Sequence, residues 1–450
     1  MNRKHTLKAL IATFATVLLW AAPLALPAQN GFNMPFSQFG IGGSDLPFNL
    51  PMVTRMGGVT HTLGGNNFIN PFNPASYASI EPESFVFDMG VGVQLSRLQS
   101  TDASITDADG NLGYLTIAMP ITKWWKLAAG LMPYSTMEYE SVQEQSDPIY
   151  GKMKTTYAGG GGVNELFVGS AFNVLRGGAH RPSLQAGFNV GLLTGHIQRN
   201  ILYDFTTNNY YLNKRRYKET AMGNVVFDLG VQMRQPLGEH YTLGVGVTYK
   251  PHLALRVKDE ALIYTYHTDR EEYPVDTIFP APGQESNYQS SVEQAQTIGV
   301  GLSIERNRRW RVAADAVFAD WQGMKYTEGI EPAVFGDGNL RYGPYSRYAL
   351  GAEKLGDMDA ATYWGRMSWS LGAHLAQGVL WLADGDATRR LDEWGVGAGV
   401  TMPMRKGRSL LTLSVGYNSL GTPDMLQQST LTFGIAVSSC ERWFYKRKYN

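Results

Sequence analysis

A strict alternation of apolar residues with small or polar ones constrains this chain most, and residues 84–95, SFVFDMGVGVQL, show it clearly. Every second residue from Phe85 to Leu95 is apolar, whereas the residues between them include Asp88, Gly90 and Gln94. A period of two is typical of a β-strand whose two faces meet different environments. The apolar face must therefore meet either a protein core or a lipid bilayer.

The same alternation recurs along the chain, in residues 182–196, 222–235, 310–320, 363–377, 408–418 and 428–438. The polar faces carry Gly, Ser, Thr, Asn and Gln rather than the many Lys and Glu residues of a solvent-exposed face. This composition favours a confined polar interior and a lipid-facing exterior, which is the pattern of outer-membrane β-barrels. A closed barrel also satisfies every backbone amide within lipid.

Composition supports a membrane protein over the alternative, a soluble secreted β protein. Charged residues make up 17% of the chain, below the roughly 25% of soluble domains. The 39 basic and 39 acidic residues cancel, so we expect no nucleic-acid partner.

Residues 1–28 are predicted to be a secretory signal peptide, because a basic start is followed by an apolar stretch and a small residue, Ala28. An uncleaved anchor helix is the alternative. Cys440 is the only cysteine, which excludes an internal disulfide and a cysteine-rich zinc site. No later stretch of 18 apolar residues predicts a membrane-spanning helix.

We predict an all-β fold, a transmembrane antiparallel β-barrel of about 14 strands over residues 84–440. Short turns alternate with long polar stretches, at residues 99–110, 139–161, 197–221, 256–292, 322–344 and 378–392. In such barrels the short turns face the periplasm and the long loops face outward. An even strand count then places both termini in the periplasm of a cell with an outer membrane.

The segments on either side of the barrel have separate predictions. Residues 29–83 are rich in Gly, Pro, Asn and Phe, too long for a simple tail and too apolar for disorder, so we expect a plug inside the lumen. Residues 441–450, ERWFYKRKYN, form a basic tail expected at the periplasmic rim. The tail would contact lipid head groups or dock a periplasmic protein.

Several motifs, in order, give the chain a family resemblance. They are Asn73-Pro74-Ala75 before the first strand, GLMPYS at 130–135, GGGGVNELFVG at 159–169, AADAVFADW at 313–321 and the ending ERWFYKRKYN. On these motifs the chain resembles the long-chain fatty acid transporter (FadL type) family of outer-membrane barrels, and especially its Bacteroidota branch. The resemblance covers most of the mature chain.

The resemblance implies a fourteen-stranded barrel closed by an N-terminal hatch, with Asn73, Pro74 and Ala75 as the hatch turn. Hydrophobic ligands would leave through the hatch, or sideways where strand three kinks inward. Gly130, Pro133 and Tyr134 would mark that lateral opening. Pro133 cannot donate a ladder hydrogen bond, which fits a break in the strand, although an ordinary strand-end proline is the alternative.

Charged residues on the polar faces are predicted to form a lumen-facing network that holds the wall to the plug. This network comprises Asp88, Glu165, Asp228, Asp315, Arg366 and His374. The chain lacks G-x-S-x-G and H-E-x-x-H motifs, so we predict no catalytic residue, no metal site and no cofactor.

The function that these observations favour is passive uptake of hydrophobic small molecules, and the resemblance implies long-chain fatty acids among them. The alternative is a non-transporting barrel subunit of an outer-membrane protein secretion or assembly complex. The expected partners are outer-membrane lipid and a hydrophobic ligand of the fatty acid class. The alternative adds outer-membrane proteins or surface lipoproteins.

Overall fold

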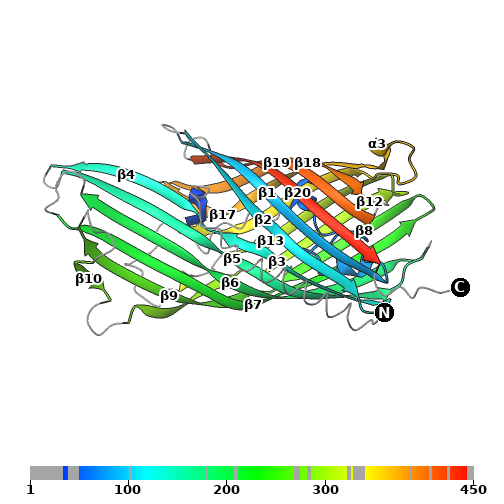
Figure 1. Cartoon of the computed structure of the whole chain (residues 1–450), viewed down its shortest axis with the longest axis horizontal. Helices are drawn as coiled ribbons and strands as arrows, with labels where there is room; N and C mark the ends of the chain where they lie inside the picture. Colours follow the sequence, from blue (N-terminus) through cyan, green and yellow to red (C-terminus); the bar gives the residue numbers. More distant parts are fainter. Residues whose placement is uncertain are drawn as a thin grey trace, which may run out of the picture.

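The computed structural model describes residues 34–38, 50–100, 104–148, 151–178, 180–205, 211–267, 274–280, 285–321, 326–327, 340–384, 387–404, 408–422 and 426–442. The predicted signal peptide and residues 443–450 of the predicted tail lie outside this part. In the described part the strands run from Ser84 to Arg442 and pair antiparallel in one sheet (Figure 1). The same residues contain no helix with the length and apolar character needed to cross a membrane.

The sheet closes on itself because its first and last strands pair. β1 (Ser84–Ser100) pairs along its whole length with β20 (Leu426–Arg442), from Ser84 opposite Arg442 to Ser100 opposite Leu426. The other edge of β1 pairs with β2 (Ser104–Pro120). A closed sheet leaves no long free edge in the bilayer, where unpaired backbone groups are costly.

Around the barrel the described strands occupy fourteen positions, which confirms the predicted fold class. Single strands fill the positions of β1, β2, β20, β5 (Gly151–Leu175), β6 (Ser183–Phe205), β7 (Asn213–Leu237), β17 (Ser368–Asp384), β18 (Ala387–Met404) and β19 (Ser409–Thr422). The other positions hold successive strands, β3 (Trp125–Thr136) with β4 (Tyr139–Asp147), β8 (Tyr241–Lys250) with β9 (Leu253–Tyr266), β11 (Asn287–Gln294) with β12 (Thr297–Arg306), β13 (Trp310–Asp320) with β14 (Tyr326–Thr327), and β15 (Leu340–Tyr342) with β16 (Pro344–Lys354). The short β10 (Asp276–Phe279) pairs with β9.

The apolar faces of the alternating segments point outward. In β1, Val91, Val93 and Leu95 are exposed, whereas Asp88 on the opposite face is fully buried. Phe188 in β6 is exposed in the same way. The apolar face of residues 84–95 is therefore the outer face of a closed barrel, which is the face that meets lipid in outer-membrane barrels.

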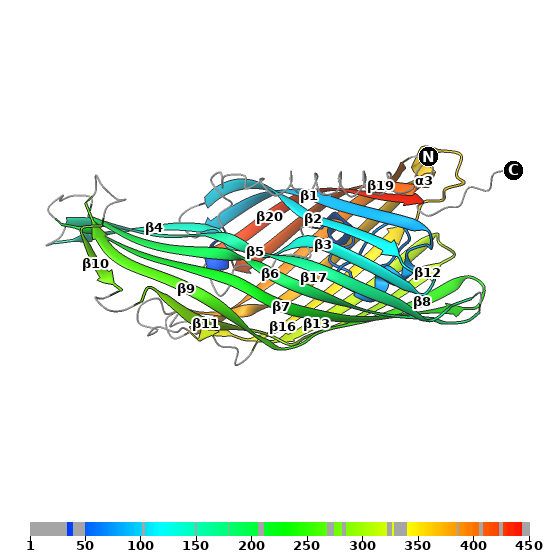
Figure 2. The same cartoon turned by 60° about the horizontal axis from the view of Figure 1, so that its bottom comes forward.

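Five stretches predicted to be long polar loops are largely strands, so that part of the prediction was wrong. The described parts of residues 99–110 and 378–392 lie in β1–β2 and β17–β18, and those of residues 139–161, 197–221 and 256–292 lie largely in β4–β7 and β9–β11. They pair in register, as Tyr157 does with Ile201. The wall therefore extends much farther on this side, at the left of Figure 2. The apolar alternation ends where the wall leaves the lipid, but the backbone pairing continues.

Arg366 does not lie on a strand, so its predicted place in the lumen-facing network was wrong. Residues 363–366 form the short helix α3 (Tyr363–Arg366), and Gly365 N donates to the side chain of the capping residue Thr362 at 3.3 Å. This local cap competes with strand pairing. Arg366 therefore lies in the turn between β16 and β17, with its guanidinium 5.8 Å from the ring centre of Tyr363.

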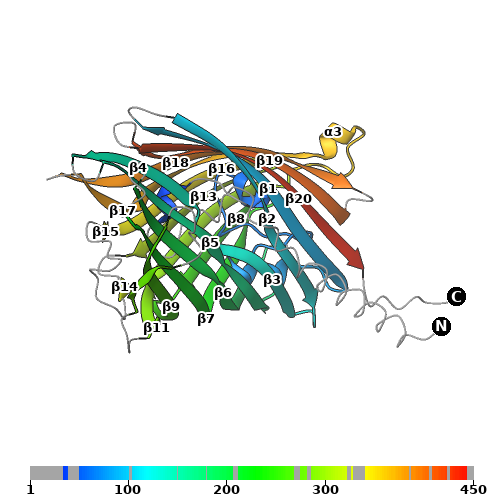
Figure 3. The same cartoon turned by 60° about the vertical axis from the view of Figure 1, so that its left-hand side comes forward.

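Residues 50–83, here called the luminal segment, lie inside the barrel (Figure 3). Its helix α2 (Pro51–Thr54) contacts β1, β18, β19 and β20, and its helix η3 (Pro74–Ser79) contacts β3, β5, β6 and β7. Every residue from Leu50 to Leu63 is buried. A third short helix, η1 (Pro35–Gln38), packs on β4, and Met34 N donates to Glu138 O at 2.7 Å. A barrel this wide has more interior than its own side chains fill.

The outward face of β5 offers a test of the bilayer boundary. Arginine in place of the exposed Val168 should destabilise the barrel by roughly 2–4 kcal/mol, because a cation would project into lipid. The matched control is Val142→Arg in β4, which lies in the extended part of the wall and is also exposed. The folded fraction in lipid vesicles, measured in a denaturant titration, should fall for the first variant alone. Equal losses would show that β4 also lies in the bilayer.

Candidate functional site in the barrel lumen

Inward side chains of the wall bind the backbone of the luminal segment. Asp315 in β13 accepts hydrogen bonds at Oδ2 from the N–H groups of Thr60 (2.5 Å) and His61 (2.9 Å). Gln232 in β7 donates through Nε2 to His61 O at 2.8 Å and to Leu63 O at 3.2 Å. An extended chain buried in a barrel needs such partners for its backbone groups.

A second set of contacts lies on β1 and β6. Asp88 accepts from the hydroxyl of Tyr114 at 2.8 Å and from the N–H of Ile69 at 3.3 Å. Asn189 accepts at Oδ1 from the hydroxyl of Tyr77 at 3.0 Å. Of the predicted lumen-facing residues, Asp88 and Asp315 thus contact the luminal segment directly.

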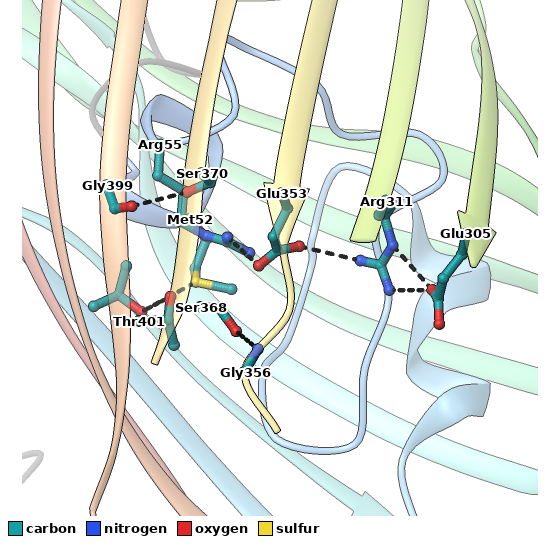
Figure 4. A network of polar contacts seen from close by, with 11 residues as sticks. Met52, Arg55, Glu305, Arg311, Glu353, Gly356, Ser368, Ser370, Gly399 and Thr401 are labelled. Carbon is teal, nitrogen blue, oxygen red and sulfur yellow. Dashed lines mark hydrogen bonds and ion pairs between the residues drawn. The ribbon is translucent and has the colours of Figure 1, made fainter. Parts of the chain in front are cut away.

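A chain of buried ions fixes the start of the luminal segment (Figure 4). Arg55 forms an ion pair with Glu353 in β16, and both side chains are almost fully buried. The other carboxylate oxygen of Glu353 lies 3.6 Å from Arg311, which binds Glu305 at 2.7 Å. A buried charge is stable only while it keeps such partners. The luminal segment is therefore held here by charge as well as by hydrogen bonds.

Inward glycines make room for the segment, and we call them the glycine belt. A Cβ atom at Gly351 would lie 2.6 Å from Met56 O, and one at Gly187 would lie 2.6 Å from Pro74 O. The belt also includes Gly90, Gly230, Gly246, Gly301, Gly372, Gly397, Gly399 and Gly434. Glycine at these positions lets the strand backbone approach the segment closely.

The predicted hatch turn begins η3. Asn73 caps the helix by accepting from Ala75 N at 3.1 Å, and its Nδ2 donates to His61 O at 2.7 Å. Pro74 is the first helical residue, a position that needs no N–H donor. Glycines of β6 and β7, Gly187 and Gly230, lie against this turn. The turn is therefore a fixed, buried part of the segment.

Two histidines lie buried in the lumen. His374 in β17 has its Nε2 3.4 Å from Glu393 Oε1 in β18. His61 has Nδ1 3.3 Å from the hydroxyl of Thr248. Burial lowers the pKa of His61, which favours the neutral imidazole.

A layer of apolar side chains lies in the lumen beyond the luminal segment. Its buried side chains, here called the apolar layer, are Met137, Tyr139, Val163, Leu193, Ile197, Met222, Val226, Leu255, Val257 and Val292. They come from β4, β5, β6, β7, β9 and β11 and from the β3–β4 connection. The sequence analysis missed this layer because it expected polar residues at every inward position.

Three charged residues border the apolar layer on the side of the luminal segment. Glu165 in β5 and Asp228 in β7 each lie two residues from a member of the layer, Val163 and Val226, on the same face of their strands. Lys250, at the end of β8, places its Nζ 3.2 Å from Asp228 Oδ1. Glu165 and Asp228 were predicted lumen-facing residues, and Lys250 was not singled out.

The third wall position breaks where the sequence contains Pro133. β2 pairs with β3 only from Pro120 opposite Lys126 to Leu115 opposite Leu131. The pairing of β3 with β5 shifts register between Pro133 and Ser135. Beyond this point, among the described residues, β4 pairs only with β5, and residues 104–114 of β2 pair only with β1.

The other two residues predicted for this break flank it. Gly130 lies where a Cβ atom would be 2.6 Å from Thr116 Cγ2 in β2, just inside the paired part. Tyr134 packs against the apolar layer. The break therefore adjoins the apolar half of the lumen.

Arg55 and Glu353 were also not predicted from the sequence as functional residues. Their ion pair joins residues 298 positions apart, so no local motif could reveal it. In the part of the chain that the structure describes, no group of three or more His, Cys, Asp or Glu residues could hold a metal ion.

Comparisons with known proteins give a family and a fold. A family model described as BamG matches residues 10–450. No curated protein matches the chain. Among solved structures, the P. putida toluene transporter TodX has 16% identity and a TM-score of 0.57, over 89% of this chain and 100% of that chain.

Two further solved structures share the fold. The CymD monoaromatic hydrocarbon channel has 12% identity and a TM-score of 0.54, over 90% of this chain and 100% of that chain. The Ralstonia pickettii toluene transporter TbuX has 14% identity and a TM-score of 0.54, over 88% of this chain and 99% of that chain. At these identities the likeness shows the barrel fold, which agrees with the fold implied by the sequence motifs.

The buried ion pair generates a double-mutant test. Arg55→Met should destabilise the chain by about 3 kcal/mol, because Glu353 loses one of its partners in the lumen. Arg55→Met with Glu353→Gln should recover part of the loss, since the unpaired charge is then gone. Thermal unfolding in detergent measures both. A double variant no more stable than the single one would show that the pair does not hold the segment.

Proposed function

The chain belongs to the BamG family. We propose that it is an outer-membrane barrel that binds and takes up hydrophobic small molecules. The matched family is not the fatty acid transporter family that the motifs suggested, although the fold expected from that resemblance is correct. The observation that carries the proposal is the apolar layer, which adjoins the break between β2 and β3.

Apolar residues at inward positions are unusual for a barrel whose interior is polar. A ligand that inserts among them leaves water, and each Å² of apolar surface buried is worth about 25 cal/mol. Met137 and Tyr139, next to the bulge at Pro133, close the layer on the side of the break. Movement of these two side chains would admit a ligand.

The wall break is the proposed exit. Gly130, Pro133 and Tyr134 mark it, and a ligand leaving there reaches the bilayer without crossing water. The hatch turn at Asn73, Pro74 and Ala75 is a poorer gate, because it is buried and bonded on both sides. In this proposal the residues before 29 export the chain, both termini lie in the periplasm, and the extended wall faces outward.

Two adjacent residues of β7 give a matched test of binding. Val226 is 3% exposed and lies in the apolar layer, whereas Val225 is 50% exposed on the outer face. Val226→Asn should weaken binding of an apolar fluorescent probe by roughly tenfold, because a polar amide replaces apolar surface that the probe would contact. Val225→Asn should leave probe binding unchanged. Titration of the purified barrel in lipid nanodiscs measures both affinities.

The same two variants test uptake. Cells carrying Val226→Asn should accumulate a radiolabelled hydrocarbon more slowly than cells carrying Val225→Asn at equal expression. Equal binding and equal uptake for the two variants would remove the apolar layer as the ligand site.

A second candidate function is a non-transporting barrel subunit of an outer-membrane protein complex. The specific observation that favours it is the wall extension formed by β4–β7 and β9–β11, a large surface beyond the bilayer (Figure 2). Purification of the tagged chain from native membranes in mild detergent, with mass spectrometry of protein and lipid, separates the two. Stoichiometric outer-membrane proteins or surface lipoproteins without bound lipid would support the subunit role. A lone barrel that carries an apolar ligand would support uptake.

A further inference from the structure

The boundary between the two halves of the lumen carries an unbalanced negative charge. On β5 the inward residues change from Val163 to Glu165, and on β7 they change from Val226 to Asp228. On β6 the inward residue between them is Gly191, and the carboxylate of Glu165 lies over it. A Cβ atom at Gly191 would also lie 2.9 Å from Val226 Cγ2. The glycine therefore makes room for the Glu165 carboxylate where the charged and apolar surfaces meet.

Among the described residues, the cation at this boundary is Lys250, and it is already engaged. Lys250 Nζ lies 3.2 Å from Asp228 Oδ1. Glu165 is only 5% exposed and forms no hydrogen bond or ion pair with another residue that the structure describes. When both carboxylates are ionised, these two groups and one ammonium give the boundary a net charge of −1. A buried carboxylate without a hydrogen-bond donor is costly, so Glu165 is a site for a donor from elsewhere.

We propose that the ligand of the lumen has an apolar body and a hydrogen-bond-donating head, favourably a primary ammonium, which meets Glu165. This inference rests on the proposed function and names the class of its ligand. The apolar layer contacts the apolar body of the ligand, and the head donates a charge-assisted hydrogen bond to Glu165. A free carboxylate head is disfavoured, since it would face Glu165 at short range and compete with Asp228 for Lys250.

The place of this boundary fits the route proposed for the ligand. Tyr134, which flanks the break in the third wall position, packs against the apolar layer and interacts electrostatically with Lys250, Glu165 and Asp228. A ligand held by its head at Glu165 therefore lies beside the break. The head group fixes its orientation, because Glu165 lies on one side of the layer.

Three probes of equal chain length test the inference: decylamine, decanol and decanoate. Each is titrated calorimetrically into the full chain in nanodiscs of zwitterionic lipid, with empty nanodiscs subtracted, at about pH 8, where a primary amine is protonated and a carboxylate ionised. We expect decylamine to bind at least about tenfold more tightly than decanoate. Decanol should lie between them.

Glu165→Gln should reduce the preference for the amine over the carboxylate to near unity and leave decanol binding within about twofold. The matched control is Glu260→Gln, at an exposed position of β9, which should keep the wild-type preference. Decanol binding also shows whether each variant keeps a folded lumen.

The outcomes separate the two claims. Decanoate binding as tightly as decylamine to the wild-type chain would overturn this inference and leave the proposed function standing. No binding of any probe would overturn both. Because the wild-type preference decides alone, failure of Glu165→Gln to fold does not prevent the test.

Discussion

The hydrogen bonds between inward wall side chains and the backbone of the luminal segment are the interaction on which the rest of the structure depends. A buried backbone group without a partner costs roughly 1–3 kcal/mol, and an irregular chain threaded through a barrel brings many such groups. Asp88, Gln232 and Asp315 satisfy them from three different strands. Since these side chains must reach a backbone, neighbouring inward positions need to be small, and the glycine belt follows from that need.

The inward residues of a single strand change in character between the two halves of the lumen. The inward residues of β6 are Gly187 and Asn189 where they meet the luminal segment, and then Leu193 and Ile197 where the segment is absent. The outward residues Phe188, Val190 and Leu192 of β6 are apolar, because lipid contacts this part of the strand. One strand therefore has an apolar outward face, small or polar inward residues beside the luminal segment and apolar inward residues beyond it. Glu165 and Asp228 lie where the inward residues of their strands change from polar to apolar.

The parts of this fold that the sequence could predict are those set by a uniform solvent. Lipid contacts Val91, Val93 and Leu95 in the same way as it contacts Phe188, so the alternation repeats and the barrel is recognisable. The lumen has no uniform solvent. Glycine there reflects the close approach of a segment far away in sequence, and Leu193 reflects its absence, so an inward residue cannot be interpreted without knowing what it faces.

Long-range pairs and local caps account for the rest. Glu353 pairs with Arg55, which lies 298 residues earlier in the chain. The sequence near either residue does not indicate this pair. The prediction that Arg366 faces the lumen failed for the opposite reason, which is a local one. The side chain of Thr362 caps a turn in a stretch whose alternation suggested a strand. The long polar stretches form strands because backbone pairing does not require lipid. The apolar alternation by which strands are recognised arises only where a strand contacts lipid.

The same contacts decide which route through the barrel costs least. Displacement of the luminal segment would uncover Glu353 and Asp315 in a low-dielectric interior and break backbone hydrogen bonds from several strands at once. Separation of β2 from β4 breaks no such bonds, since residues 104–114 have no pairing on that side among the described residues. The proposed route sideways through the wall therefore breaks fewer hydrogen bonds than displacement of the luminal segment would.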